Sequence, residues 1–423
     1  MSTPWLFLDM NAFFASVEQQ ENPALRGVPT IVVPTLADTT CAIAASYEAK
    51  RFGIRTGTGV REAKALCPGL RIVDARTGVY RRYHKAIVDL LNQRFATIRV
   101  LSVDEMACRL SPLLRETPEE IGRLVKADIR ANLGDCLTCS VGVAPNIFLA
   151  KVASEMEKPD GLVVLRDEDI PERLYGLNLR DLPGIGRKML TRLQVNRIMT
   201  VKDLYDASYP DLKSATGSVV GKRWWFMLRG SQEVDYGAEA EAPRQSIGHS
   251  HVLPPRLRDR PGATSVLLRL LSKALRRMRS YGQAASSLNI YIQYVRPGSA
   301  QRARHSAKHS WHAHIVQSPA DDDLKWFRAA REQLRDMEYP EPGFVPLLVG
   351  VTLGQLCDFE DVTLSLFDRT TKLHALSAAV DRLNARFPNG VDLASVYWLR
   401  RQGPDPISFG ASLLKEDHDL LTP

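Results

Sequence analysis

The sequence has no long hydrophobic run and no internal repeat. Its longest apolar stretches, such as 5–8 and 266–271, are far shorter than the roughly 20 residues that cross a bilayer. No segment recurs at a fixed period, which argues against a repeat architecture. The first residues carry no basic leader with a small-residue cleavage site, so we expect neither a secretory signal nor a membrane partner.

Cysteine is also scarce, with six residues scattered through a chain of 423. This content excludes a disulfide-stabilised secreted scaffold and favours reduced thiols in the cytoplasm. Cys136 and Cys139 have the spacing of a metal-binding pair, but no second pair accompanies them. We therefore predict a buried apolar role for these two cysteines.

The composition is otherwise that of an ordinary globular protein, with 44% hydrophobic and 25% charged residues. At about 100 to 200 residues per domain, this length predicts three or four domains. Lys and Arg number 56 against 48 Asp and Glu, which gives a net charge of +8. Such an excess fits either solubility or a polyanionic partner, and clustering of the basic residues distinguishes the two.

The N-terminal segment 5–8 has the pattern of a buried strand and runs directly into Asp9. Asn11 then offers an N-cap for a helix through about Gln20. A strand that ends on a carboxylate beside a helix N-terminus is a common way to build a phosphate or metal site. A plain helix cap is the alternative reading of Asn11.

A second segment, 99–105, also runs from apolar residues into acids, Asp104 and Glu105. Neighbouring strand residues point to opposite faces, so both acids serve one site only where the strand bends or ends. Residues 146–156 follow with the spacing of a helix that has one apolar stripe.

Between residues 166 and 206 the pattern changes to short helices joined by turns. A tight turn with Gly184 and Gly186 precedes Arg187 and Lys188, which is typical of a helix-hairpin-helix. Such a turn exposes backbone N–H groups to a phosphate without reading bases. A plain helix connection remains the alternative for so short a motif.

A polar stretch over 237–244 predicts a linker, and beyond it strand patterns alternate with a helix over about 264–280. The basic residues of this module are Arg256, Arg258, Arg260, Arg269, Lys273, Arg276, Arg277, Arg279, Arg296, Arg302, Arg304 and Lys308. Their clustering favours a nucleic-acid partner, with Arg276 and Arg277 as candidate DNA contacts, although solvated helix faces account for some of them.

The acids fit one kind of chemistry. Phosphoryl transfer to a 3′-hydroxyl requires charge neutralisation on the attacking and leaving oxygens, which two Mg²⁺ ions about 3.5 to 4 Å apart provide. Mg²⁺ prefers hard oxygen ligands and keeps waters and substrate phosphates, so two or three carboxylates suffice. Asp9, Asp104 and Glu105 supply that number.

Three blocks then carry a family resemblance. They are Asp9-Met-Asn-Ala-Phe-Phe-Ala-Ser-Val-Glu18, Ser102-Val-Asp-Glu105, and a stretch from Cys139-Ser-Val-Gly-Val-Ala-Pro-Asn to Lys158-Pro-Asp-Gly161. Their order and spacing resemble the signature motifs of Y-family translesion DNA polymerases of the bacterial DinB/UmuC type, over about residues 5–367.

The resemblance implies an α+β multidomain fold, a right-hand polymerase with palm, small fingers, helix-hairpin-helix thumb and a separate little-finger domain. The expected boundaries are 1–11 with 76–165 for the palm, 12–75 for the fingers, 166–236 for the thumb, 237–244 for the linker, 245–354 for the little finger and 355–423 for a tail.

By this resemblance, Asp9, Asp104 and Glu105 are the catalytic metal ligands, and the Met10 carbonyl is a backbone oxygen donor. Phe14 falls at the steric-gate position, where an aromatic ring would collide with a ribose 2′-hydroxyl and favour deoxynucleotides. The alternative is that Phe14 is a core aromatic on the first helix, and that placement is compatible with the gate role.

The stretch Tyr47-Glu-Ala-Lys50-Arg51-Phe-Gly53 is similar to the fingers motif whose Tyr and basic residue contact the incoming triphosphate. Lys158 matches the palm lysine that does the same. A lysine supplies a point charge, which is enough to position a phosphate.

The chain departs from the family pattern at several positions. Lys50 stands where Arg is commonest and Asn11 where Asp is frequent, and both resemble the SOS-mutagenesis branch. After the acid pair, Ala107 and Arg109 replace an aromatic residue and Asp. We expect these two changes to affect geometry and rate rather than reaction type, because the three ligands remain.

The tail carries Thr363-Leu-Ser-Leu-Phe-Asp368, which is similar to the peptide that docks bacterial polymerases onto the sliding clamp, with Thr363 in place of Gln. Leu364, Leu366 and Phe367 would be the apolar anchors that fill a groove. Local packing of the tail is the alternative.

Together these features predict a cytoplasmic, monomeric enzyme that extends primer-template DNA with deoxynucleoside triphosphates, using two Mg²⁺ ions, at low fidelity and without proofreading. One alternative is a catalytically weak or inactive relative that acts as a DNA- and clamp-binding scaffold. A scaffold has no need of the acids together, so their joint presence favours the enzyme. A DNA-packaging protein would explain the basic module but not the acids.

Overall fold

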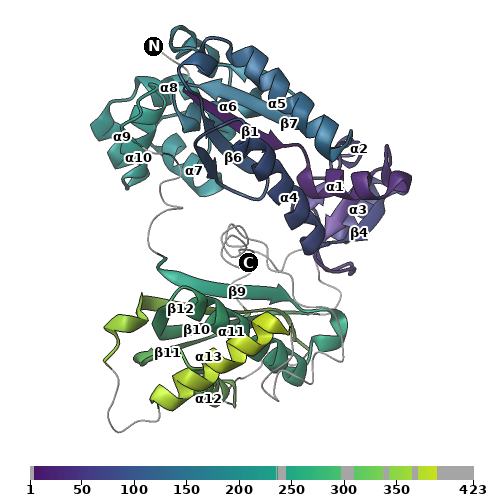
Figure 1. Cartoon of the computed structure of the whole chain (residues 1–423), viewed down its shortest axis with the longest axis vertical. Helices are drawn as coiled ribbons and strands as arrows, with labels where there is room; N and C mark the ends of the chain where they lie inside the picture. Colours follow the sequence, from purple (N-terminus) through teal and green to yellow (C-terminus); the bar gives the residue numbers. More distant parts are fainter. Residues whose placement is uncertain are drawn as a thin grey trace.

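The computed structural model describes residues 4–234, 236, 244–296, 309–335, 337, 343–363 and 370–387. Residues up to 234 form one body with two sheets, and residues from 244 onward form a second body with a sheet of its own (Figure 1). Most of the expected linker lies outside the described residues. No described helix is long and apolar enough to cross a membrane.

The central sheet of the first body has five strands, which lie in the order β5 (Ile98–Val100), β6 (Glu105–Arg109), β1 (Trp5–Met10), β7 (Cys139–Ala144) and β8 (Leu162–Val164). The pairs are antiparallel except β7 with β8, which are parallel. The N-terminal strand predicted from the apolar run thus forms the middle of a sheet and is buried on both faces.

Side chains of β1 alternate between two cores. Leu6, Leu8 and Met10 pack in a cluster with side chains from α4 (Thr77–Asn92) and α5 (Pro118–Leu133). Phe7 packs in the other cluster, which α6 (Ile147–Met156) shares with the short helices that follow. Because neighbouring residues point to opposite faces, Asp9 lies on the same side of the sheet as Phe7 and α6.

Two local predictions were wrong. Residues 99–105 do not form one strand, because β5 ends at Val100, a turn occupies 101–104, and β6 begins at Glu105. Asn11 is not a helix N-cap, since α1 (Phe13–Glu21) is preceded by Ala12 in the left-handed region, with φ +48° and no side-chain cap. The predicted helix over 146–156 is confirmed, and Asn146 caps it through the Leu149 N–H.

The expected fingers region contains a small three-stranded sheet in the order β3 (Ala44–Ala45), β2 (Thr30–Val33) and β4 (Arg71–Asp74), with helices α2 (Tyr47–Lys50) and α3 (Val60–Leu66). This region has its own buried core, which includes Ile31, Ile54 and Val60. Helix α1 instead contributes Phe13, Ala15 and Val17 to the core of the central sheet.

The expected thumb contains four short helices, α7 (Arg187–Val195), α8 (Val201–Asp206), α9 (Tyr209–Thr216) and α10 (Val220–Met227). Their apolar faces join the α6 side of the central sheet in one continuous core around Trp224. A Cβ on Gly184 would lie 3.4 Å from the Trp224 ring, and Gly184 has φ +92°, so the turn requires glycine there.

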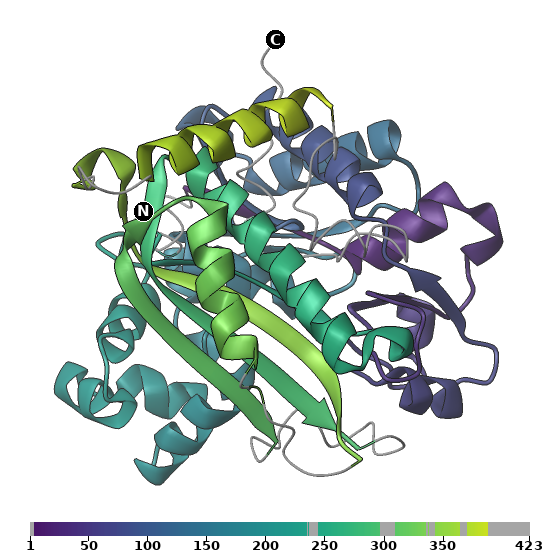
Figure 2. The ribbon, with the colours of Figure 1, turned by 90° about the horizontal axis from the view of Figure 1, so that it is seen from below.

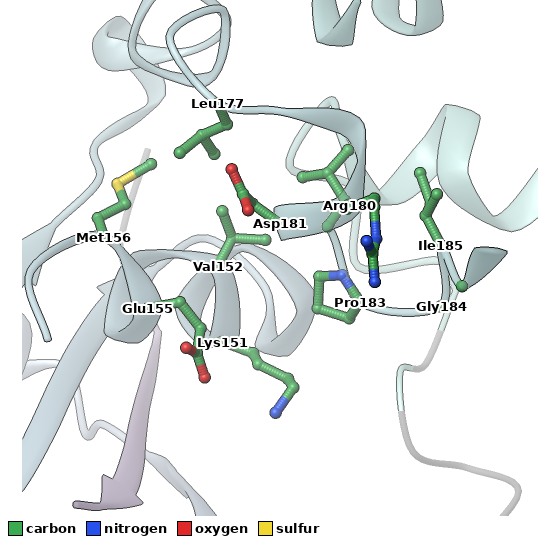
Figure 3. A pocket seen from close by; sticks show the side chains of 12 residues that line it. Lys151, Val152, Glu155, Met156, Leu177, Arg180, Asp181, Pro183, Gly184 and Ile185 are labelled. Atoms are coloured by element: carbon green, nitrogen blue, oxygen red, sulfur yellow. The ribbon is translucent and has the colours of Figure 1, made fainter. Parts of the chain in front are cut away.

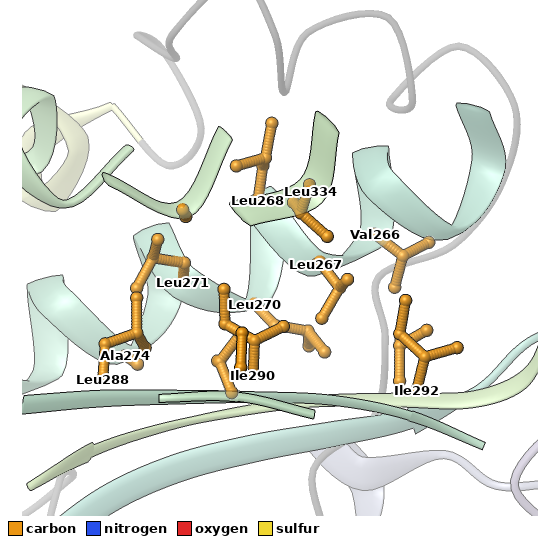
Figure 4. Packing of buried hydrophobic residues seen from close by; sticks show 14 of the residues in the cluster. Val266, Leu267, Leu268, Leu270, Leu271, Ala274, Leu288, Ile290, Ile292 and Leu334 are labelled. Carbon is orange, nitrogen blue, oxygen red and sulfur yellow. The ribbon is translucent and has the colours of Figure 1, made fainter. Parts of the chain in front are cut away.

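The second body has a four-stranded antiparallel sheet in the order β11 (Ser310–Ala320), β10 (Gln283–Val295), β12 (Val345–Asp358) and β9 (Ser246–Val252). Helices α11 (Arg260–Ser280) and α12 (Asp323–Arg335) cover one face of it, and α13 (Thr370–Arg386) packs beside α12 (Figure 2). Leu267, Leu271 and Ala274 of α11 pack onto Leu288 and Ile290 of β10 (Figure 4).

Two boundaries in this body differ from expectation. Helix α11 begins at Arg260 rather than near 264, because the Asp259 carboxylate accepts a hydrogen bond of 2.7 Å from the Gly262 N–H and caps the helix. The expected division after residue 354 falls inside β12, which continues to Asp358. Arg258 donates to the Thr39 hydroxyl at 2.5 Å, which joins this body to the fingers region.

Candidate active site

Three carboxylates lie at one edge of the central sheet. Asp9 of β1 pairs across the ladder with Glu105 of β6 on one side and with Ser140 of β7 on the other. Asp104 lies in the preceding turn, where its carbonyl accepts a hydrogen bond of 2.9 Å from the Met10 N–H. The turn allows both adjacent acids to belong to one site, because Asp104 is not bound by the alternation of a strand.

Two lysines pair with these carboxylates. The Lys158 ammonium lies 2.8 Å from Asp9 and 2.7 Å from Glu155. The Lys151 ammonium forms an ion pair with Glu105 and lies over the Phe7 ring. Both lysines approach from the α6 side, so the acids and the cations lie on the same face of the sheet.

Burial controls the protonation of Asp9, which is only 6% exposed. Desolvation raises the pKa of this carboxyl from 3.8 to about 7, and the Lys158 ammonium opposes the rise. For Lys158, burial works to lower the pKa, but Asp9 and Glu155 outweigh it and the pKa is raised. The ammonium therefore stays charged, and the carboxylate is held in place by a cation that a ligand would have to replace.

The donor set suits a hard divalent cation, although the side chains as they stand do not enclose one. No three His, Cys, Asp or Glu side chains in the described parts of the chain are gathered closely enough to hold a metal ion. Two of the three carboxylates instead form ion pairs, Glu105 with Lys151 and Asp9 with Lys158. Carboxylate oxygens that already face cations at one sheet edge match the ligands that Mg²⁺ prefers.

The residues expected to contact a triphosphate lie around the same acids. The Tyr47 hydroxyl donates to the Asn11 side-chain oxygen at 3.3 Å, and the Lys50 ammonium lies 4.0 Å from the centre of the Tyr47 ring. Burial lowers the pKa of Lys50, and the Lys158 charge adds to the effect. The structure therefore brings Tyr47, Lys50 and Lys158 together beside Asp9.

Asn11 has a role other than the predicted cap. Its side-chain oxygen also accepts a hydrogen bond of 3.0 Å from Ser140, and its amide donates to Thr138 at 3.1 Å. The residue is 1% exposed. Asn11 thus fixes the chain between Asp9 and α1 and orients the Tyr47 hydroxyl.

Phe14 lies on α1 and stacks on Tyr80 of α4, with ring centroids 4.5 Å apart. The Tyr80 hydroxyl donates to Glu18 at 2.7 Å, and Arg76 donates to both oxygens of Glu18. This buried network holds the Tyr80 ring in one orientation, so Phe14 rests on a rigid surface.

The glycine turn of the thumb and helix α6 line a cavity of about 660 Å³. Lys151 and Glu155 of α6 line one wall, and Arg180 and Gly184 line the other (Figure 3). Gly186 ends the turn as the residue before α7, and Arg187 and Lys188 of the first turn of α7 are exposed. The cavity adjoins the acids through Lys151, which lines it and pairs with Glu105.

Arg276 and Arg277, the candidate DNA contacts of the little finger, lie on α11. Arg277 is only 8% exposed, and Arg276 pairs with Asp381 of α13 at 3.4 Å. Arg279 on the same helix is also buried, between Asp323 of α12 and Asp381. Arg276 and Arg279 face the neighbouring helices, whereas the Arg277 guanidinium lies 6.0 Å from the centre of the Tyr281 ring. The DNA contacts expected at Arg276 and Arg277 stay predictions.

Two other predictions concern the clamp-like segment and the cysteine pair. The clamp-like anchors Leu364, Leu366 and Phe367 lie outside the described residues. Cys139 is buried in the core of the central sheet and Cys136 is half-buried beside it.

The substitutions after the acid pair do not disturb the ladder. Ala107 is buried opposite Phe7 of β1, and Arg109 pairs with Trp5 at the end of β6 that is remote from Asp9.

Sequence reasoning missed Lys151, Glu155 and Tyr80. Lys151 and Glu155 are spaced at i and i+4 on α6, which places two charged side chains along one line of an otherwise apolar helix, and Lys158 follows just after the helix ends. That spacing was a usable signal for the first two. Tyr80 offered none, because its partner Phe14 lies 66 positions earlier in the chain.

Comparisons with known proteins agree with this geometry. A model described as the impB/mucB/samB family matches residues 8–155, the C-terminal domain of that family matches 244–366, and a DNA polymerase-iota thumb-domain model matches 180–232. DNA polymerase IV of Pelotomaculum thermopropionicum is 34% identical over 399 residues, 92% of this chain and 93% of that protein. DNA polymerase IV of Moorella thermoacetica is 33% identical over 90% of this chain and 93% of its own.

Solved structures share the fold. A Y-family DNA polymerase chimera has a TM-score of 0.65 at 24% identity, over 83% of this chain and 98% of that chain. The insertion ternary complex of Dbh DNA polymerase has a TM-score of 0.52 at 23% identity over the same shares. The palm, fingers, thumb and little-finger architecture is therefore confirmed. The chain belongs to the impB/mucB/samB family of DinB-like, Y-family DNA polymerases.

Proposed function

We propose that this protein is a template-directed DNA polymerase that adds deoxynucleotides to a primer 3′-hydroxyl and acts in low-fidelity lesion bypass. The observation that carries the proposal is the position of Asp9, Asp104 and Glu105 on adjoining segments at one sheet edge, with Tyr47 and Lys158 beside Asp9. The full-length relatives named DNA polymerase IV support it. No feature of the described residues favours the inactive scaffold over the enzyme.

Asp9, Asp104 and Glu105, with the Met10 carbonyl, would hold two Mg²⁺ ions. Bound there, the ions would neutralise charge on the attacking and leaving oxygens of an in-line displacement. The chain itself contributes position more than covalent chemistry. Lys151 pairs with Glu105 and Lys158 with Asp9 before substrate arrives, and Lys158 is then available to a phosphate.

Tyr47, Lys50 and Lys158 would position the triphosphate. Their hydroxyl and ammonium groups lie near Asp9, so a nucleotide held by them would have its α-phosphate close to the acids. Such pre-positioning lowers the entropic part of the barrier.

Phe14 would exclude ribonucleotides, since Tyr80 prevents its ring from yielding to a 2′-hydroxyl. Phe14→Ala should therefore reduce discrimination against ribonucleotides by at least about tenfold. The check is kcat/KM for dCTP and CTP opposite a template G. Unchanged sugar selectivity would remove the gate role, and Phe13→Ala, on the same helix but 3% exposed, is the matched control.

Primer-template DNA would bind through the thumb turn, where Gly184 and Gly186 expose backbone N–H groups and Arg187 and Lys188 add charge. The enzyme would act as a monomer. All six cysteines are free thiols, which supports a cytoplasmic site of action.

The segment 363–368 would recruit the bacterial sliding clamp through Leu364, Leu366 and Phe367. Replacing Leu366 and Phe367 with Ala should weaken binding to the clamp without lowering extension in its absence. Equal clamp affinity, measured by surface plasmon resonance, would refute this assignment.

Primer extension tests the proposed activity directly. The purified chain is incubated with Mg²⁺ and each deoxynucleoside triphosphate alone, on undamaged and lesion-bearing templates. We expect extension directed by the template, with frequent mismatches and with bypass of at least one lesion. Lack of extension on every template, by protein that binds the same DNA, would favour the scaffold and overturn the proposal.

A further inference from the structure

The turn that carries Asp104 has few backbone ties of its own. Residues 101–104 lie between β5 and β6 and belong to neither strand. The N–H groups of Leu101 and Ser102 donate to the Glu105 carbonyl, at 3.0 and 3.2 Å, and the Ser102 hydroxyl donates to the Asp104 carboxylate at 2.6 Å. These bonds are internal to the turn. The Asp104 carbonyl also accepts from the Met10 N–H at 2.9 Å, which ties the end of the turn to β1, but none of these bonds connects the turn to a helix.

His84 connects this turn to α4. Its Nδ1 lies 2.8 Å from the Val103 carbonyl oxygen, and the residue is 9% exposed. Because a carbonyl oxygen can only accept, Nδ1 must carry the hydrogen and donate it. A buried histidine that satisfies a carbonyl is commonly a simple core residue. Here, however, the carbonyl belongs to the peptide group that also contains the Asp104 N–H.

The position of His84 on α4 also relates it to the residues around Phe14. Tyr80, one helical turn earlier, supports the Phe14 ring. The same rigid helix thus contacts the ring beside the nucleotide sugar position and the turn that carries a carboxylate ligand. Residues i and i+4 lie on one face of a helix, so both contacts come from a single surface.

We propose that His84 is a positioning residue for the metal site: its Nδ1–H holds the Val103 carbonyl and thereby sets the direction in which Asp104 projects. The inference rests on the proposed function, since it concerns the ligands of that reaction. Loss of the bond would leave the fold and the DNA contacts intact but would allow the turn to move, so that metal binding requires reordering it.

Three substitutions separate the donor from the rest of the side chain. In His84→Asn the amide nitrogen occupies the place of Nδ1, in His84→Gln it occupies the place of Nε2, and in His84→Leu no donor remains. Val88→Ala is the matched control, because Val88 is equally buried one turn further along α4. It reports what a loss of packing in this helix does by itself.

The measurement is Mn²⁺ binding by electron paramagnetic resonance, with a dideoxy-terminated primer-template and a non-hydrolysable deoxynucleotide analogue. The Mg²⁺ concentration for half-maximal single-turnover extension is measured alongside. We expect His84→Leu and His84→Gln to weaken Mn²⁺ affinity and raise the Mg²⁺ requirement by about three- to tenfold, the worth of one hydrogen bond. His84→Asn should remain within about twofold of the native protein, and so should Val88→Ala.

The inference is overturned if His84→Leu binds Mn²⁺ like the native protein, if Asn behaves like Gln, or if Val88→Ala shifts the metal requirement as far as Leu does. If His84→Leu does not fold, the Asn and Gln pair decides, since both keep a polar side chain. Failure of the proposed function is distinct: the native protein would then bind DNA without extending it, while Mn²⁺ binding would still report on His84.

Discussion

The palm and the little finger both contain buried cations paired with carboxylates, yet the pairs differ in kind. In the palm, the Lys158 ammonium meets Asp9 at 2.8 Å while the lysine side chain remains 24% exposed. In the little finger, Arg279 is 7% exposed and joins α11 to Asp323 of α12 and Asp381 of α13. A partly exposed point charge can move to a ligand, whereas a guanidinium held between three helices cannot.

The contrast shows that a count of positive charges does not tell where each side chain lies. The basic cluster of the little finger indicated a nucleic-acid surface, but Arg276 and Arg279 pair with carboxylates of other helices and Arg277 is buried in the same domain. In the palm, the more exposed cation Lys158 lies among the residues that a triphosphate would contact. The cations of the palm and of the little finger differ in their exposure and in the groups that surround them, not in the number of charges.

The largest effect on stability is expected for Arg279→Met. The substitution leaves Asp323 without its cation and Asp381 with Arg276 alone, at 3.4 Å, which should destabilise the little finger by about 3 kcal/mol. Hydrogen exchange in α11 and α13 measures it. The affinity for primer-template DNA should stay the same under conditions where the domain remains folded.

Arg187→Ala on the exposed face of the thumb is the contrasting control, with lower DNA affinity and little change in stability. If Arg279→Met weakened DNA binding without loosening α13, the arginine would be a DNA contact and the distinction between the two regions would fail.

A smaller effect is expected for Lys158→Met, which removes the cation from the palm. We expect kcat/KM for the incoming nucleotide to fall by about 100-fold, mostly through KM, because the phosphates lose a point charge in a partly buried site. Pre-steady-state nucleotide titrations measure this. Lys64→Met, which removes an exposed pair with Asp38 in the fingers, should leave kcat/KM unchanged. A loss of DNA affinity instead of nucleotide affinity would contradict the assignment.

The smallest effect concerns Asp9 itself in metal-free protein. Its pKa is about 7 when folded against an ordinary aspartate value of 3.8, so the folded state binds the proton more tightly. Stability due to this group therefore falls as pH rises from about 4 to 7, and the full penalty remains above pH 7. Asp9→Asn should thus raise stability by about 2 kcal/mol at pH 8, and the gain should fade toward pH 4.

Thermal unfolding with EDTA at several pH values checks this expectation. Asp104→Asn is the control, since Asp104 is only half-buried in its turn. A gain for Asp9→Asn that does not depend on pH would show that burial of the charge is not its cause.

Much of the catalytic region could be predicted because it depends on short segments. A buried strand ending at Asp9 and a helix over 146–156 follow from local apolar patterns, and motif spacing joins Asp104 and Glu105 to them. The error over residues 99–105 arose because a tight turn between two short strands looks like one strand when only hydrophobicity is considered.

What failed to follow from the sequence depends on long-range partners. Asn11 is held by Ser140 and Thr138, more than 120 positions away, so nothing near it distinguished this role from a helix cap. The burial of Arg277 depends on how α11 packs in its domain, a question of tertiary structure that charge patterning does not address.

One measurement tests the central claim that the three carboxylates form the site of a polymerase. Single-turnover primer extension with Mg²⁺ compares the native chain with Asp104→Ala, alongside equilibrium binding of the same primer-template. We predict extension by the native chain and a loss of at least about 1000-fold in the variant, since several kcal/mol of charge stabilisation disappear. DNA affinity should be unchanged. Extension by Asp104→Ala at a rate near that of the native chain would contradict the account.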